Sequence, residues 1–275
     1  MPVPEAIVRR GAKAQEAIST LAGKTAAQAL PDLSTLSRYD AGGVIRTVAT
    51  GTVGAFGQAS TATGVQTYGE FQGWASSSGL LKKKYAPTAL ANFGSTITEM
   101  VDPLVGRSMA AHSQGLFEEA AAYLTAGIVR EVTNVYRQTI GENSSKDPNV
   151  TWYQRVASAD ACAFCSFIAA TTENTQWADD DGYHDHCGCT TVPVFEGDGG
   201  YRPDYYDALD SDIAQAQAEI RDLYDRERPG WQDKWQASGG RMGKNLNRDF
   251  LKAFPQAATN TENILARIRA NTGRK

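Results

Sequence analysis

Hydrophobic residues recur at helical spacing through the first half of the chain, separated by polar and small residues. The pattern predicts a helix from Pro4, with Ile7 on its apolar stripe and Gly23 as its end. A second segment begins near residue 32. Gly42 and Gly43 are predicted to interrupt it, because glycine is a poor helix former.

Small residues dominate the next segment, 47–74, which is therefore predicted to be helical with breaks. The lysine-rich stretch 82–87 interrupts the pattern and is predicted to be a loop. The strongest helical pattern follows over 103–140. One apolar face recurs there at spacings of mostly three and four, formed by Leu104, Met109, Leu116, Ala120, Leu124, Ile128, Val132 and Tyr136.

The second half has weaker periodicity and more turn residues. Residues 141–150 are polar, contain glycine and proline, and are predicted to be a linker. β-Branched residues after Cys189 predict a short strand, which Pro193 would place at a sheet edge. Residues 205–226 predict an acidic, solvated helix. The segment from 239 onward is basic, with Arg241, Lys244, Arg248, Lys252, Arg267, Arg269, Arg274 and Lys275.

Together these elements predict a mainly α fold. We expect a helical domain at 1–145, a small α+β cysteine/histidine module at 150–200, and a helical C-terminal extension with a basic tail at 201–275. The helical domain is the part expected to associate with other proteins.

Composition changes this picture little. A hydrophobic content of 41% and a charged content of 21% are ordinary for a soluble globular protein, and the net charge of -4 gives no global reason to expect a nucleic-acid binder. We expect neither a membrane span nor a secretory signal, because the required apolar runs are not found in the sequence. In a reducing compartment, clustered cysteines favour metal or redox roles over structural disulfides.

All four cysteines and two of the three histidines lie in one window, as C-A-F-C and then H-D-H-C-G-C. A Cys-x-x-Cys turn can place two sulfurs on one zinc ion, and cysteines two apart on an extended segment point to the same side. We therefore predict a structural zinc site with the candidate ligands Cys162, Cys165, His184, Cys187 and Cys189. The leading set is Cys162, Cys165, Cys187 and either His184 or Cys189. Two other interpretations stay open: reduced cysteines without metal, and disulfides that join the two arms.

Catalytic interpretations fit this window less well. A zinc nucleobase deaminase needs a glutamate beside its first ligand, ahead of the Cys-x-x-Cys, whereas here the Cys-x-x-Cys comes first and Asp185 stands between two histidines. A thioredoxin-like site expects a β-α-β setting, which the pattern does not predict. His112, on the long predicted helix, is expected to have a packing or surface role. We therefore expect no enzymatic activity.

The window resembles the C-terminal module of MuF-like phage minor capsid proteins, also called head morphogenesis proteins, in the form found in actinobacterial tailed phages. The family pattern is an Arg-Val segment leading to Cys-x-x-Cys, then a loop, then His-x-x-Cys-x-Cys entering a short hydrophobic strand. The match covers about 150–196. The positions that fall on the pattern in order are Arg155, Val156, Cys162, Cys165, His184, Cys187, Cys189, Pro193 and Val194.

The resemblance implies a protein that associates with the portal, and with other capsid or scaffold proteins, during head assembly in the host cytoplasm. It further implies packaging in few copies in the virion, inside the capsid or at the portal vertex, and it does not imply an enzymatic activity. The basic tail would meet packaged DNA or an acidic portal surface, or form a solvated terminus. No membrane partner is expected.

The main alternative is a metal- or thiol-dependent hydrolase, or a toxin-like enzyme, carried in the virion. It requires an open zinc position or an activated thiolate, and a nearby carboxylate as base, for which Asp160 and Asp185 are nearest in sequence. A nucleic-acid-binding zinc module fits poorly, because residues 173–185 are acidic where phosphate contacts need positive charge.

Overall fold

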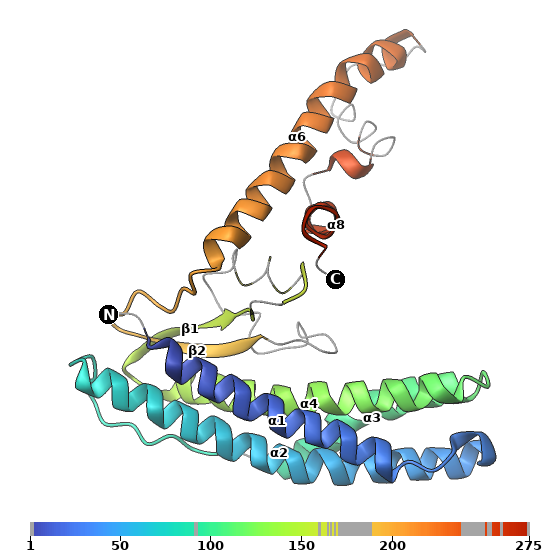
Figure 1. Ribbon diagram of the computed structural model, residues 1–275, viewed down its shortest axis with the longest axis vertical. Coiled ribbons are helices and arrows are strands. Elements are labelled where there is room, and N and C mark those ends of the chain that lie inside the picture. The colour runs from blue at the N-terminus through green and yellow to red at the C-terminus, as the bar shows by residue number, and fades with distance from the viewer. Residues whose placement is uncertain are drawn as a thin grey trace. The chain divides into compact units, whose positions relative to one another are not determined.

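The chain is mainly helical with a small two-stranded antiparallel sheet, as predicted (Figure 1). The computed structural model describes residues 3–90, 93–158, 161–163, 165, 167, 169, 189–237, 251, 255–258 and 261–273. These residues form two compact units. The first holds the described parts of Met1–Ser158 and Thr172–Arg202, and the second those of Ala159–Thr171 and Pro203–Lys275.

Long helices build most of the first unit. They are α1 (Glu5–Ala29), α2 (Arg38–Ser77), α3 (Phe93–His112) and α4 (Phe117–Lys146). Helices α1, α2 and α4 pack against one another, and α3 packs against α2 and α4. Every helix of the bundle therefore buries one face against at least two others.

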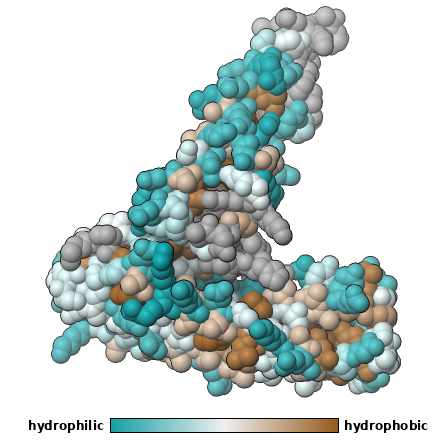
Figure 2. All heavy atoms as spheres, in the orientation of Figure 1, coloured by the Kyte–Doolittle hydropathy of each residue, from teal (hydrophilic) through white to brown (hydrophobic). Residues whose placement is uncertain are grey.

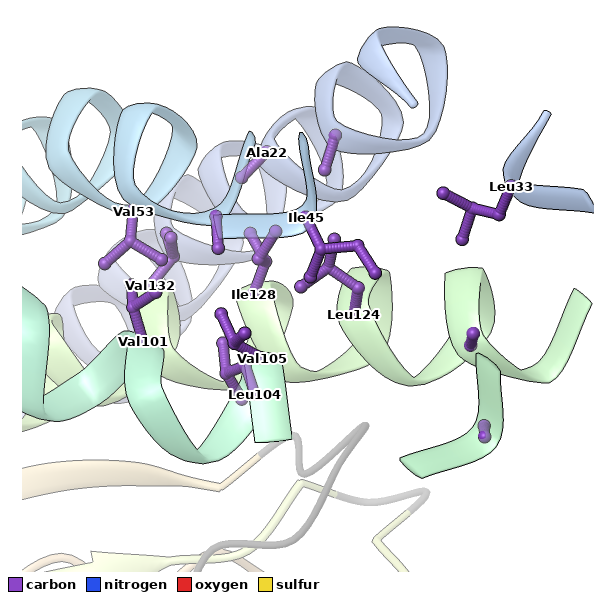
Figure 3. Close-up of a cluster of buried hydrophobic side chains, with 14 residues drawn as sticks. Ala22, Leu33, Ile45, Val53, Val101, Leu104, Val105, Leu124, Ile128 and Val132 are labelled. Atoms are coloured by element: carbon purple, nitrogen blue, oxygen red, sulfur yellow. The ribbon is translucent and has the colours of Figure 1, made fainter. Parts of the chain in front are cut away.

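A hydrophobic core fills the bundle (Figure 3). Its α4 side chains recur every four residues, as the sequence pattern predicts for one buried face. The short 3-10 helix η1 (Leu33–Thr35), between α1 and α2, adds one leucine. The labelled core residues are Ala22, Leu33, Ile45, Val53, Val101, Leu104, Val105, Leu124, Ile128 and Val132.

The single helix predicted over 103–140 is two helices. A turn at 113–116 separates α3 from α4, and Gly115 adopts the left-handed conformation there, with φ of 77°. Glycine enters this region without the steric penalty of a side chain, so it permits the reversal. Leu116, predicted on the buried face, lies in the turn and is 41% exposed.

The glycines predicted to end or interrupt the first helices do neither. Helix α1 continues through Gly23 to Ala29, and α2 runs without a break through Gly42 and Gly43. A Cβ at Gly23 would lie 2.7 Å from Cγ2 of Val129, so this glycine permits a close approach of α1 to α4. Ser37 caps the start of helix α2, and its hydroxyl oxygen accepts from the backbone N–H of Asp40 at 3.2 Å.

The sheet pairs β1 (Val150–Val156) with β2 (Thr190–Phe195), and β2 confirms the predicted short strand. Arg155 lies opposite Thr191 and Tyr153 opposite Pro193. Apolar residues of both strands join a second core with the N-terminal part of α1 and the C-terminal parts of α2 and α4. The strand residues of this core are Val156, Val192 and Phe195, and the helical ones are Ile7, Val8, Tyr68, Phe71, Ala75, Tyr136 and Ile140.

The second unit contains α6 (Tyr206–Ala237), the 3-10 helix η2 (Pro255–Ala257) and α8 (Thr261–Thr272). Helix α6 is longer than the predicted 205–226 and continues through Pro229. Its apolar stripe, with Ile213, Ala216 and Ile220, packs on Leu265 and Ile268 of α8. The visible face of α6 is mainly hydrophilic (Figure 2), as predicted for a solvated helix. None of the helices described here is both long and apolar enough to cross a bilayer.

Candidate functional site: the cysteine arms and a buried polar centre

The first cysteine arm lies in the second unit, where Cys162 is half-buried and Cys165 is buried. The backbone N–H of Cys165 donates to Sγ of Cys162 at 3.4 Å. Donation of this kind favours the thiolate, which is the form of cysteine that binds metals.

Hydrophobic packing holds this arm in place. The described positions 163, 165, 167 and 169 are helical. Ala163 is fully buried in the core that α6 and α8 form, and Phe167 packs against the same core. The Cys-x-x-Cys segment is therefore anchored by the main core of its own unit.

The second arm is described at Cys189, which is buried and directly precedes β2 in the first unit. Its carbonyl oxygen accepts a hydrogen bond of 2.8 Å from Nε of Arg137 on α4. Arg137 is only 2% exposed, and a second guanidinium nitrogen donates to Oδ1 of Asn134 at 3.0 Å. A buried guanidinium thus ties the start of β2 to α4.

Three of the five predicted ligands, Cys162, Cys165 and Cys189, lie among the described residues, whereas His184 and Cys187 lie outside them. Within the described residues, no three His, Cys, Asp or Glu side chains gather closely enough to hold a metal ion. The zinc site therefore stays a prediction, as do the alternatives of disulfides and of reduced cysteines. The two candidate bases of the enzyme hypothesis, Asp160 and Asp185, also lie outside the described residues.

The prediction of a linker at 141–150 is wrong. Helix α4 continues to Lys146, and Asn143, Asp147 and Asn149 are each no more than 2% exposed. With Tyr68 and Gln72 of α2 they form what we call the polar centre. The polar composition suggested a solvated segment, but these side chains are buried because partners distant in sequence satisfy their hydrogen bonds.

Asp147 accepts four hydrogen bonds at the polar centre. Its Oδ2 accepts from the hydroxyl of Tyr68 at 3.1 Å and from Nε2 of Gln72 at 2.9 Å. Its Oδ1 accepts from the backbone N–H of Asn149 at 2.9 Å and from Nδ2 of the same residue at 2.7 Å. Burial, and then the charge of Asp147, raise the pKa of Tyr68, so the phenol stays protonated and donates.

The two asparagines of the polar centre hold the chain between α2 and α3. Oδ1 of Asn149 accepts from the backbone N–H groups of Lys82 and Lys83, both at 2.8 Å, and Nδ2 donates to the carbonyl of Lys83 at 2.8 Å. Asn143 bonds both backbone groups of Thr88 and accepts from the hydroxyl of Tyr85 at 2.9 Å. The loop predicted at 82–87 is thus confirmed, and its backbone is fixed at several points.

His112 has the packing role that was one of its two expected roles. Its ring is buried, its Nε2 lies 3.1 Å from the carbonyl oxygen of Leu33, and it meets Phe117 edge-on with ring centroids 5.1 Å apart. His112, the last residue of α3, thus joins η1 to the start of α4.

Residues 3–216 match the family model described as VG15 protein, and this range spans the described part of the first unit, both cysteine arms and the start of α6. Neither the curated proteins nor the solved structures gave a match. Because the family model covers most of the chain, the chain belongs to the VG15 protein family, a family of phage proteins.

Proposed function

We propose that the protein is a phage minor capsid protein of the head morphogenesis type, which associates with the portal and is packaged inside the head. Two observations support this proposal. The chain belongs to a phage protein family. The segment 150–196 also resembles the cysteine/histidine module of MuF-like minor capsid proteins over nine ordered positions.

These two observations carry the proposal, and the buried polar groups of the first unit fit it. Asp147 accepts from four donors, Arg137 holds the start of β2, and His112 bonds the backbone of η1. An enzyme needs titratable groups that reach a substrate, whereas these groups bind other parts of the fold. These bonds make the described body of the first unit rigid, as an assembly protein requires.

For the cysteine/histidine module we propose a structural zinc ion. Cys162, Cys165, Cys187 and either His184 or Cys189 would hold it, and the ion would supply a cross-link between segments distant in sequence. The N–H donation to Cys162 fits this role, because it favours a thiolate ligand. The basic C-terminal segment is the part that we propose to meet DNA or an acidic portal surface.

The zinc proposal predicts about one zinc per chain in protein purified under reducing conditions without chelator. Cys162→Ser should remove most of the metal, because it deletes a ligand of the leading set. Cys189→Ser serves as the comparison: retained zinc would make His184 the fourth ligand. Elemental analysis reads out both variants, and wild-type protein without zinc would contradict the proposal.

Portal association predicts that the chain co-purifies with the portal protein encoded by the same phage genome when the two are co-expressed. Size-exclusion chromatography at moderate salt should show them eluting together. The enzyme alternative is tested in parallel with Asp185→Ala, which should leave phage infectivity unchanged, whereas Cys162→Ser should impair head assembly. Separate elution would count against the portal as partner, and loss of infectivity with Asp185→Ala alone would favour an enzyme.

A further inference from the structure

The loop between α2 and α3 presents three consecutive lysines on a backbone that the polar centre holds. Lys82, Lys83 and Lys84 are all exposed, and we call this segment the lysine loop. One buried side chain, Asn149, binds the backbone N–H groups of the first two and the carbonyl of the second. The segment has no regular secondary structure, so its position depends on these side-chain bonds rather than on a helix or sheet.

Two of these lysines have no ion-pair partner among the described residues. Lys82 pairs with Glu196 at 2.8 Å, but no carboxylate in the described part of the chain pairs with Lys83 or Lys84. Within the part of the chain that the structure describes, both ammonium groups therefore extend from a fixed backbone without a carboxylate partner. Like charges on adjacent residues repel one another, so the arrangement favours an external anion.

The apolar residues next to the three lysines pack inward, against the protein core. Leu80, Leu81 and Tyr85 pack against the core that the sheet shares with α1, α2 and α4. The exposed large hydrophobic residues of the described chain lie elsewhere, at Leu21, Tyr39, Leu116 and Tyr123. The outer face of the lysine loop thus offers charge without an apolar anchor.

Exposed charge without an apolar anchor favours a nucleic acid over a protein as the partner of the lysine loop. Protein interfaces depend on buried aromatic or aliphatic anchors at their centre. Contacts to the phosphate backbone of nucleic acids depend on lysine and arginine charges and carry no sequence information. We propose that the lysine loop contacts phosphates of double-stranded DNA without sequence preference. The proposal deepens the proposed function, on which it rests for the presence of DNA around the protein.

The test measures binding of the full chain to a random double-stranded DNA by fluorescence anisotropy across a series of salt concentrations. Lys83→Ala/Lys84→Ala should weaken binding at least about tenfold at 0.1 M salt and lower the slope of log K against log salt by about two. The matched control is Lys13→Ala/Lys24→Ala, which removes the same charge from two exposed positions of α1. It should lower the slope by much less.

Equal effects of the two double variants would overturn the proposal, because they would show a response to net charge alone. A Lys83→Ala/Lys84→Ala protein that still binds DNA normally but loses binding to poly-glutamate would overturn it in favour of an acidic protein partner. Circular dichroism checks that the variants fold, as exposed lysine side chains predict. Because purified protein and DNA suffice, the result is independent of portal association.

Discussion

Asp147→Ala is expected to lower the free energy of unfolding of the first unit by about 3–4 kcal/mol. The substitution leaves the hydroxyl of Tyr68 and the backbone N–H of Asn149 buried without their acceptor. Nε2 of Gln72 loses one of its two hydrogen-bond acceptors. Each buried donor without a partner costs about 1–3 kcal/mol. The loss should lower the melting temperature by about 10 °C in a thermal scan followed by circular dichroism.

Asp102→Ala is the matched control for this loss. Asp102 lies exposed on α3 and pairs with Arg46 at 2.5 Å, so its removal breaks a surface ion pair worth at most about 1 kcal/mol. A small, similar effect of both substitutions would show that the polar centre contributes little to stability. The position of the lysine loop would then need another explanation.

Gly64→Ala should destabilise the bundle by about 2–3 kcal/mol, although alanine is the better helix former. A Cβ at this position of α2 would lie 2.7 Å from Cβ of Thr139 and 3.2 Å from the backbone carbonyl oxygen of Tyr136. Both atoms belong to α4 close to its backbone, so only a movement of one helix away from the other relieves the contact. Chemical denaturation should report the change.

Gly73→Ala is the matched control on the same helix. A Cβ there would meet nothing within 4 Å, and the position is exposed, so the variant should gain up to about 1 kcal/mol from helix propensity and reduced chain entropy. The two variants should therefore differ in sign. If Gly64→Ala also stabilised the protein, the close packing of α2 on α4 would be wrong.

One helix face of the fold could be predicted from the sequence, whereas the roles of two glycines could not. The apolar face of α4 was predictable, because one buried stripe at four-residue spacing needs only local information. Gly23 and Gly115 have the same identity but opposite roles. Gly23 permits contact with Val129, a residue far along the chain, whereas Gly115 forms a turn. Without the partner helix, the sequence pattern cannot distinguish the two roles.

The polar centre was beyond prediction for a related reason. Asn143, Asp147 and Asn149 lie in a stretch rich in linker residues, and their partners lie 55 to 79 positions away. The one local signal was Asp-Pro-Asn at the end of a helix, where the backbone N–H of Asn149 bonds the side chain of Asp147 two residues before it. Burial of such residues depends on tertiary partners that composition does not reveal.

The cysteine arms were found from their spacing alone, because cysteine and histidine are rare enough in this chain for one window to stand out. The supports of the arms were not predicted. Arg137 lies within the strongest helical pattern, where a charged residue suggests a solvated face, yet it is buried and holds the carbonyl of Cys189. The residues that hold the start of β2 are thus distant in sequence from the motif.

The most direct test of the proposed function is the protein composition of purified, DNA-filled virions of the phage that encodes this chain. Quantitative mass spectrometry should find the chain in these particles, in few copies compared with the major capsid protein. It should remain after nuclease treatment of the particle surface, because the proposal places it inside the head. Abundant chain in the infected-cell lysate with none in the purified virions would contradict a minor capsid protein.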